Sequence, residues 1–165
     1  MSGAAAEGAP REAPRSGGLY GTVLVLAVII ALTKSGKAEA SILLGGILVT
    51  SLVFWLVHVY ADTLAARVAR PDLSWLDLAR VHALHELPIL EAPLGPAIPL
   101  ALGTVGILSR QAASWSAIAV CLVALFGWGT AVARALGYRG AVAIGMGLLN
   151  VGLGGAMVGL KVLVH

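Results

Sequence analysis

The stretch SILLGGILVTSLVFWLVHVYA, Ser41 to Ala61, decides the fold class. It contains no Lys, Arg, Asp or Glu over about 21 residues, and a helix of that length covers ~31 Å. The hydrocarbon core of a bilayer is about 30 Å thick, and a helix needs roughly 20 apolar residues to cross it. The stretch therefore predicts a transmembrane helix.

The composition of the whole chain agrees with a membrane protein. Of its 165 residues, 59% are hydrophobic and only 12% are charged, and the mean hydropathy is +0.94. A soluble domain carries about 25% charged residues. The net charge of +3 comes from Lys and Arg scattered between apolar runs, so we expect no nucleic-acid partner. The single cysteine, Cys121, lies in an apolar run and is expected to be a buried small residue.

Further apolar runs on both sides of this stretch predict an all-α, polytopic transmembrane helix bundle. About five spans are expected, at 18–33, 41–61, 93–108, 115–133 and 140–164.

Two segments of the chain are too polar to span. Residues 73–87 begin after Pro71, with Asp72 and Ser74 placed as a cap, and predict an interfacial or re-entrant helix. Residues 1–17 are small, polar and Pro-containing, and we expect a disordered tail. Residues 18–165 then form one transmembrane domain.

The Lys and Arg residues between the spans indicate the orientation. With the N-terminus inside, the inside set is Arg11, Arg15, Arg67, Arg70, Arg80, Arg134 and Arg139. The outside set is Lys34, Lys37, Arg110 and Lys161. Because the inside set is larger, we predict a multi-pass protein of the cell membrane with a cytoplasmic N-terminus.

Polar residues of the second span fall on one helical face. At 100° per residue, Ser51, Trp55, His58 and Asp62 form a narrow stripe. Because a polar side chain facing lipid is costly, this stripe should look into the bundle. One interpretation is that His58 and Asp62 belong to a polar site. The alternative is that His58 is hydrogen-bonded to a neighbouring helix and Asp62 lies among the headgroups.

The sequence HALHELPILEAP, His82 to Pro93, carries the other polar candidates. His82, His85 and Glu86 share a helical face at positions i, i+3 and i+4, a spacing that can ligate a divalent metal ion. The HExxH pattern of zinc proteases is absent. The alternative is an interfacial helix whose polar residues are solvated.

Glu91 lies inside an apolar run between Pro88 and Pro93. Prolines free backbone carbonyls, and broken helices at membrane depth are tolerated where they face protein or a water-filled cavity. An acid at such a break can hold a cation or relay a proton. The alternative is that the span begins near Leu94, which would leave Glu91 in the headgroup zone.

The last span is rich in glycine. Gly152, Gly155 and Gly159 form a small-residue surface, and Asn150 is its strongly polar side chain. Small residues let helix backbones approach closely in lipid. We therefore predict helix packing here, within one chain, between copies in a homo-oligomer, or against a partner membrane protein.

Three motifs together carry a resemblance. They are HVYAD (58–62), ELPILEAP (86–93) before a Pro-broken span, and the final GLKVLVH (159–165). In this combination the chain resembles small uncharacterised integral membrane proteins of high-GC bacteria, from Leu19 onward. The resemblance implies a membrane location and no particular activity.

Two functions follow from these residues. The first is a small cation transporter or channel, for protons or a divalent metal, in which His58, Asp62, Glu86 and Glu91 line the route. The second is a non-catalytic scaffold or accessory subunit that assembles through the last helix. No G-x-S-x-G motif and no c-type haem attachment motif is present, so the sequence names no catalytic residue. A divalent metal is the one cofactor that the residues suggest.

Overall fold

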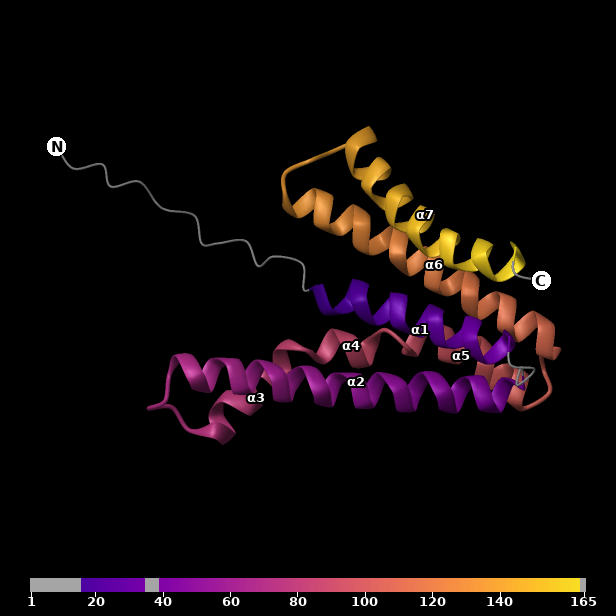
Figure 1. The fold of residues 1–165 in the computed structure, drawn as a ribbon. Coiled ribbons are helices and arrows are strands. Elements are labelled where there is room, and N and C mark those ends of the chain that lie inside the picture. The colour runs from indigo at the N-terminus through magenta and orange to yellow at the C-terminus, as the bar shows by residue number, and fades with distance from the viewer. Residues whose placement is uncertain (1–15, 35–38, 164–165) are drawn as a thin grey trace.

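The fold is a bundle of helices. A computed structural model describes residues 16–34 and 39–163 (Figure 1). The described residues form α1 (Ser16–Lys34), α2 (Ala40–Ala69), α3 (Trp75–His85), α4 (Leu87–Glu91), α5 (Leu94–Thr104), α6 (Arg110–Ala135) and α7 (Ala141–Leu163). Only Ala92 and Pro93 separate α4 from α5, and both keep helical backbone angles. The two elements therefore make one bent helical segment.

Three of these helices are long and apolar enough to cross a bilayer, namely Ala40–Ala69, Leu87–Thr104 and Arg110–Ala135. Two apolar helices are shorter, Gly17–Thr33 and Ala141–Ala156. The all-α prediction is confirmed. Three of the five predicted spans correspond to full-length candidates, whereas the first and the last correspond to the shorter apolar helices.

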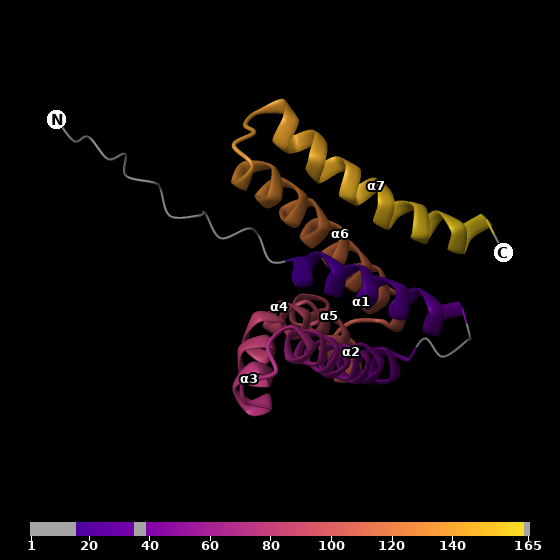
Figure 2. The ribbon, with the colours of Figure 1, turned by 60° about the vertical axis from the view of Figure 1, so that its left-hand side comes forward.

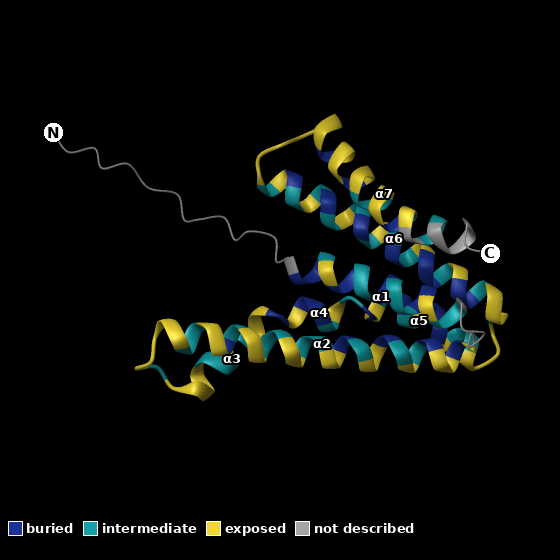
Figure 3. Ribbon diagram, viewed as in Figure 1, coloured by how far each residue is buried: buried dark blue, intermediate teal, exposed yellow. Residues whose placement is uncertain are grey.

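The exposed face of α2 supports contact with lipid. Its apolar side chains Leu48, Val49, Leu52, Val53, Leu56 and Val57 are all exposed. Leu43 and Ile47 on the other face are fully buried. A helix that is apolar all round belongs in a membrane or in the core of a large protein. Figure 3 shows exposed residues along the outer faces of the bundle, and on α2 that outer face suits a bilayer.

Helix α2 continues past the predicted end at residue 61. It runs to Ala69, so its 30 residues cover ~45 Å. Asp62 does not stop the helix, because one acid among Ala and Leu residues costs little helix propensity. The helix ends before Pro71, whose ring disfavours the helical conformation for Arg70. Asp62 therefore lies within a helix and not at its end.

Helices α5 and α6 end in the same glycine motif. After α5, Gly106 has a φ of 82°, its N–H bonds to Gly103 O at 3.2 Å, and Ile107 N–H bonds to Leu102 O at 2.9 Å. This is the Schellman arrangement, which needs a left-handed residue that glycine supplies without strain. It ends α5 at Thr104, before the predicted residue 108.

The fourth predicted span, 115–133, is longer in the structure at both ends. Ser109 caps α6, and its Oγ accepts a hydrogen bond from Ala112 N at 3.2 Å. At the other end Gly137, with a φ of 88°, repeats the Schellman arrangement. These local stops set the ends of α6, which contains the whole predicted span.

The first helix also begins earlier than expected. We predicted a tail over residues 1–17, but Ser16 and Gly17 already belong to α1. Residues 1–15 lie outside the described part of the chain, as do residues 35–38 and 164–165. The predicted polar helix, 73–87, is present as α3, which covers Trp75–His85.

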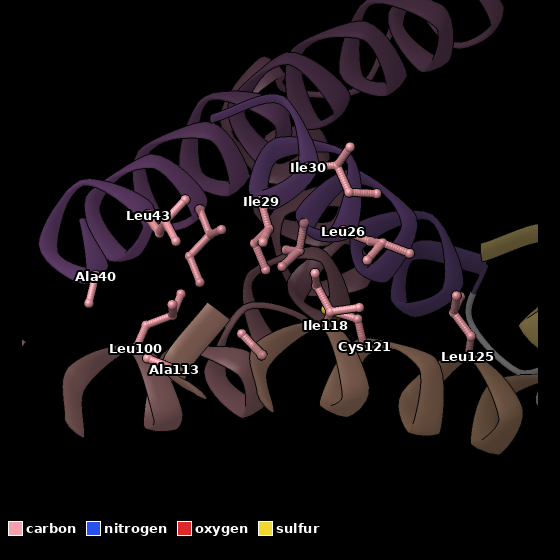
Figure 4. Close-up of a cluster of buried hydrophobic side chains, with 13 residues drawn as sticks. Leu26, Ile29, Ile30, Ala40, Leu43, Leu100, Ala113, Ile118, Cys121 and Leu125 are labelled. Carbon is pink, nitrogen blue, oxygen red and sulfur yellow. The ribbon is translucent and has the colours of Figure 1, made fainter. Parts of the chain in front are cut away.

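Helix α1 lies between two groups of helices. It packs against α2 and α4 on one side and against α6 and α7 on the other (Figures 1 and 2). Its side chains Leu26 and Ile29 are fully buried. Figure 4 shows them in one apolar cluster with side chains of α2, α5 and α6, among them Leu43, Leu100 and Cys121. This cluster fills the middle of the bundle.

Helix α3 folds back along the far end of α2 (Figure 1). Trp55 Nε1 donates a hydrogen bond to Ala83 O at 3.2 Å, and the rings of Tyr60 and Trp75 lie 6.0 Å apart. Arg67 also donates to the carbonyl of Leu73, across the turn. The return of the chain along α2 brings the end of α3 beside the middle of α2.

Candidate functional site

A small pocket forms where α1, α2 and α4 meet. Its volume is about 230 Å³. It is lined by Gly17 and Tyr20 of α1, His58 and Asp62 of α2, Glu86 at the junction of α3 and α4, and Ile89 of α4. Three of the four predicted polar-site residues, His58, Asp62 and Glu86, are therefore brought together.

The imidazole of His58 is fixed by its own helix and by aromatic rings. Its Nδ1 lies 3.0 Å from Phe54 O. Because a carbonyl oxygen only accepts hydrogen bonds, Nδ1 must carry the proton, and Nε2 of the neutral ring is then an acceptor. The Phe54 ring lies 4.4 Å from the His58 ring and stacks on Tyr20 at 5.6 Å. The aromatic contacts thus join α1 to α2 beside the pocket.

Asp62 lies one helical turn after His58, so both side chains project from the same face of α2. Because α2 continues to Ala69, the carboxyl group of Asp62 is held on a regular helix. These two residues of the predicted stripe both line the pocket.

Glu86 is the buried acid of the pocket. It is only 8% exposed, and its position is fixed because its N–H bonds to His82 O at the end of α3. One carboxylate oxygen, Oε1, lies 2.9 Å from Nδ1 of His85, whose side chain is 61% exposed. The other oxygen, Oε2, lies beside Gly17, where an added Cβ would be 3.2 Å away. A buried carboxylate is costly unless hydrogen bonds or a cation compensate it.

The contribution of α1 was missed by the sequence analysis, which treated residues 1–17 as a tail. Gly17 and Gly21 form a GxxxG pair in the segment GGLYG, and both face α4. A Cβ on Gly21 would lie 2.8 Å from Ala92 Cβ and 3.3 Å from Ile89 O. In the sequence, two small residues four positions apart were the signal for close helix packing. This close packing of α1 against α4 places Tyr20 at the pocket.

Glu91 does not lie with His58, Asp62 and Glu86. It is exposed and does not line the pocket. Five residues after Glu86, it points about 140° away around the helix. The expected break at Pro93 is present, since α4 ends at Glu91 and α5 starts at Leu94. Pro93 has no N–H for the carbonyl of Ile89, and α1 packs its glycine face against this break.

The proposed metal ligands do not converge. His85 is exposed and pairs with Glu86, whereas His82 does not line the pocket. Within residues 16–34 and 39–163, no group of three or more His, Cys, Asp or Glu side chains is placed to hold a metal ion. The His82, His85 and Glu86 triad is therefore not assembled as a ligand set in this part of the chain.

The other two residues of the α2 stripe have different surroundings. Trp55 donates the hydrogen bond to Ala83 O that holds α3 against α2. Ser51 is 1% exposed, and its Oγ has no hydrogen-bond partner among the described residues. Neither side chain lines the pocket.

Glycines also hold α7 to α6. Gly129 of α6 approaches Gly147 of α7, with an added Cβ only 2.8 Å from its Cα. Gly154 packs against Leu125. In contrast, Gly152, Gly155 and Gly159 have nothing within 4 Å of an added Cβ.

The predicted packing surface of α7 is therefore open in the described chain. Asn150 does lie at the α6–α7 contact, because its Nδ2 is 2.6 Å from the Cβ position of Gly129. The open glycines leave packing against another copy or a partner as the remaining form of that prediction, because they do not meet α6 in the described chain.

No protein-family model, curated protein or solved structure matches the chain at a significant level. Function has to be inferred from the residues themselves. The pocket combines two carboxyl groups and an imidazole with an aromatic ring, and none of its lining residues is Lys or Arg. Such a lining can hold a positively charged group.

Proposed function

We propose that this chain is a multi-pass protein of the cell membrane, with a cytoplasmic N-terminus, that binds a small cation and carries it across the bilayer. The site is His58, Asp62 and Glu86. All five apolar helices cross the membrane in this proposal, the shorter α1 and α7 included, with α3 at the interface. The location agrees with the resemblance to small integral membrane proteins of high-GC bacteria.

The observation that carries the proposal is the meeting of two acids and a histidine in one pocket. Asp62 and Glu86 come from segments that are distant in sequence, and both line it. Two carboxylates that share a small space repel each other, and a bound proton or cation relieves this repulsion. With no Lys or Arg among the lining residues, an external cation has no internal competitor in the pocket.

Passage beyond the pocket requires a movement of helices. The apolar cluster that includes Leu26, Ile29 and Leu43 fills the middle of the bundle. An ion cannot cross such a cluster without a large desolvation cost. We propose that α1 is the moving element, because its glycine contacts with α4 include, among the described residues, no hydrogen bond or ion pair that would have to break.

A flux assay in proteoliposomes tests the proposal. Asp62→Asn and Glu86→Gln remove one charge each with little change of shape. Since a hydrogen bond to a charged group contributes about 1.5–3 kcal/mol, each change should lower cation flux roughly 10- to 150-fold. Glu91→Gln is the matched control, because Glu91 is exposed and lies outside the pocket. Its flux should stay within about twofold of the unmodified protein.

One result would contradict transport, namely an unmodified protein that gives no flux above empty vesicles for protons, monovalent cations or divalent metals. A Glu91→Gln variant as inactive as Asp62→Asn would contradict the assignment of the route to this pocket, because Glu91 lies outside it.

A second candidate function is membrane assembly through α7. The specific observation is the open glycine face formed by Gly152, Gly155 and Gly159. Energy transfer between labelled copies in liposomes measures self-association. Gly155→Leu should abolish the signal, whereas Gly45→Leu, at an equally open glycine on α2, should leave it unchanged. An equal signal for both variants would remove this candidate.

A further inference from the structure

We infer that the cation held by the pocket is a small organic ammonium or guanidinium ion and not a bare metal ion. This inference rests on the proposed function, because it names the class of substrate for the same site. It is drawn from the volume of the pocket, the hydrogen-bond acceptors in its wall, and the aromatic ring of Tyr20 that lines it.

The volume is the first argument. About 230 Å³ corresponds to the volume of about eight water molecules, at roughly 30 Å³ each. A bare divalent ion would occupy a small part of this space and would need four or more ligand atoms at about 2.0–2.6 Å. The described residues offer no group of three metal-ligating side chains. The pocket is therefore too wide and too poorly supplied with ligands for a dehydrated metal ion.

The polar wall is made of acceptors. The carboxylate of Asp62 accepts hydrogen bonds, and so does Oε2 of Glu86, which faces Gly17. Nε2 of His58 is also an acceptor when the ring is neutral, because Nδ1 then donates to Phe54 O. A ligand that satisfies all three must bring several N–H donors. A primary ammonium brings three and a guanidinium group brings five.

The charge of the pocket suits a single positive charge. Glu86 shares one oxygen with His85, whose imidazole balances that carboxylate when it is protonated. Asp62 has no such partner among the described residues, and its carboxylate is the main unbalanced charge in the wall. One positive charge placed beside Asp62 therefore balances a carboxylate that no ion pair balances among the described residues.

The aromatic part of the pocket wall favours an organic cation over a hydrated metal ion. Tyr20 is 58% exposed, and its ring lines the pocket together with Ile89. An aromatic ring attracts an ammonium or guanidinium group. A hydrated metal ion presents only water to this ring and gains little from it.

Binding to the purified full-length protein in nanodiscs tests this inference by calorimetry. The probes are propylammonium, methylguanidinium, Mg²⁺ and Mn²⁺, with 1-propanol as the uncharged control. Both organic cations should bind, and Asp62→Asn should weaken them at least tenfold. Tyr20→Leu should weaken them about two- to fivefold, and Tyr20→Phe should restore the affinity because it keeps the ring. Glu91→Gln should bind as the unmodified protein does.

The possible failures are distinguishable. Binding of Mn²⁺ or Mg²⁺ that depends on Asp62, without binding of either organic cation, overturns the organic substrate and keeps the proposed function. Binding of the organic cations that Tyr20→Leu leaves unchanged overturns the role of the aromatic wall, and binding of 1-propanol with equal affinity overturns the role of charge. No binding and no flux of any cation overturns the proposed function together with the inference. Thermal unfolding of each variant separates lost binding from lost folding.

Discussion

Replacing Gly21 with alanine should push α1 away from α4 and lower the free energy of unfolding. The new Cβ would lie 2.8 Å from Ala92 Cβ and 3.2 Å from Ile89 Cα. Carbon atoms in contact sit about 3.5–4.0 Å apart. Because Ile89 Cα is backbone, it cannot rotate away, and the helices must separate by on the order of 0.5 Å. Overpacking of this kind costs about 1–3 kcal/mol.

A second glycine provides the control. Gly45 on α2 has nothing within 4 Å of an added Cβ. Both substitutions replace a helical glycine by alanine, which by itself favours the helix by about 1 kcal/mol. The difference between the two variants therefore isolates the contact with α4. We expect Gly21→Ala to be about 1–3 kcal/mol less stable than Gly45→Ala.

Reversible unfolding by SDS in mixed micelles, followed by circular dichroism, measures this difference. The cation affinity of Gly21→Ala should also fall, because Gly17 and Tyr20 move away from the pocket together with α1. Equal free energies of unfolding for the two variants would refute the close α1–α4 contact on which the pocket wall depends.

Two further changes test other parts of the bundle. Ser51→Ala removes a buried hydroxyl that has no hydrogen-bond partner among the described residues. The free energy of unfolding should therefore stay the same or rise by about 1–3 kcal/mol. A decrease of more than about 1 kcal/mol would show that the hydroxyl is hydrogen-bonded. Trp55→Phe removes the hydrogen bond to Ala83 O and should weaken the packing of α3 against α2 by about 0.5–1.5 kcal/mol. The amide hydrogens of Trp75–His85 should then exchange faster. Unchanged exchange would contradict a stabilising role for this hydrogen bond.

Much of the fold was visible in local patterns. The apolar run at 41–61 predicted a membrane helix, and α2 contains all of it. The ends of the helices depend on signals that hydropathy does not weigh. Gly106 ends α5, and α2 continues eight residues beyond residue 61 until Pro71 ends it. A glycine that takes a positive φ, or a proline that restricts its neighbour, acts over one or two residues.

Half of the candidate site was also predictable. His58 and Asp62 share a face of α2 because of helical periodicity alone, and the segment His82 to Pro93 was the expected counterpart. The choice of Glu86 over Glu91 was not predictable. Both acids lie in HALHELPILEAP, and the one that meets α2 depends on the rotation of α4 after the turn at Glu86.

The sequence by itself determined the class of this protein, its apolar helices and the face of α2 that carries polar groups, because these follow from residue spacing along one helix. Only the tertiary structure decided that α1 would supply Gly17 and Tyr20, that Glu91 would stay outside, and that Gly147 and Gly154 would pack where Gly152 and Gly155 do not. These choices depend on how each helix is rotated against its neighbours. Rotation is set by packing between residues far apart in the chain, which no local spacing encodes.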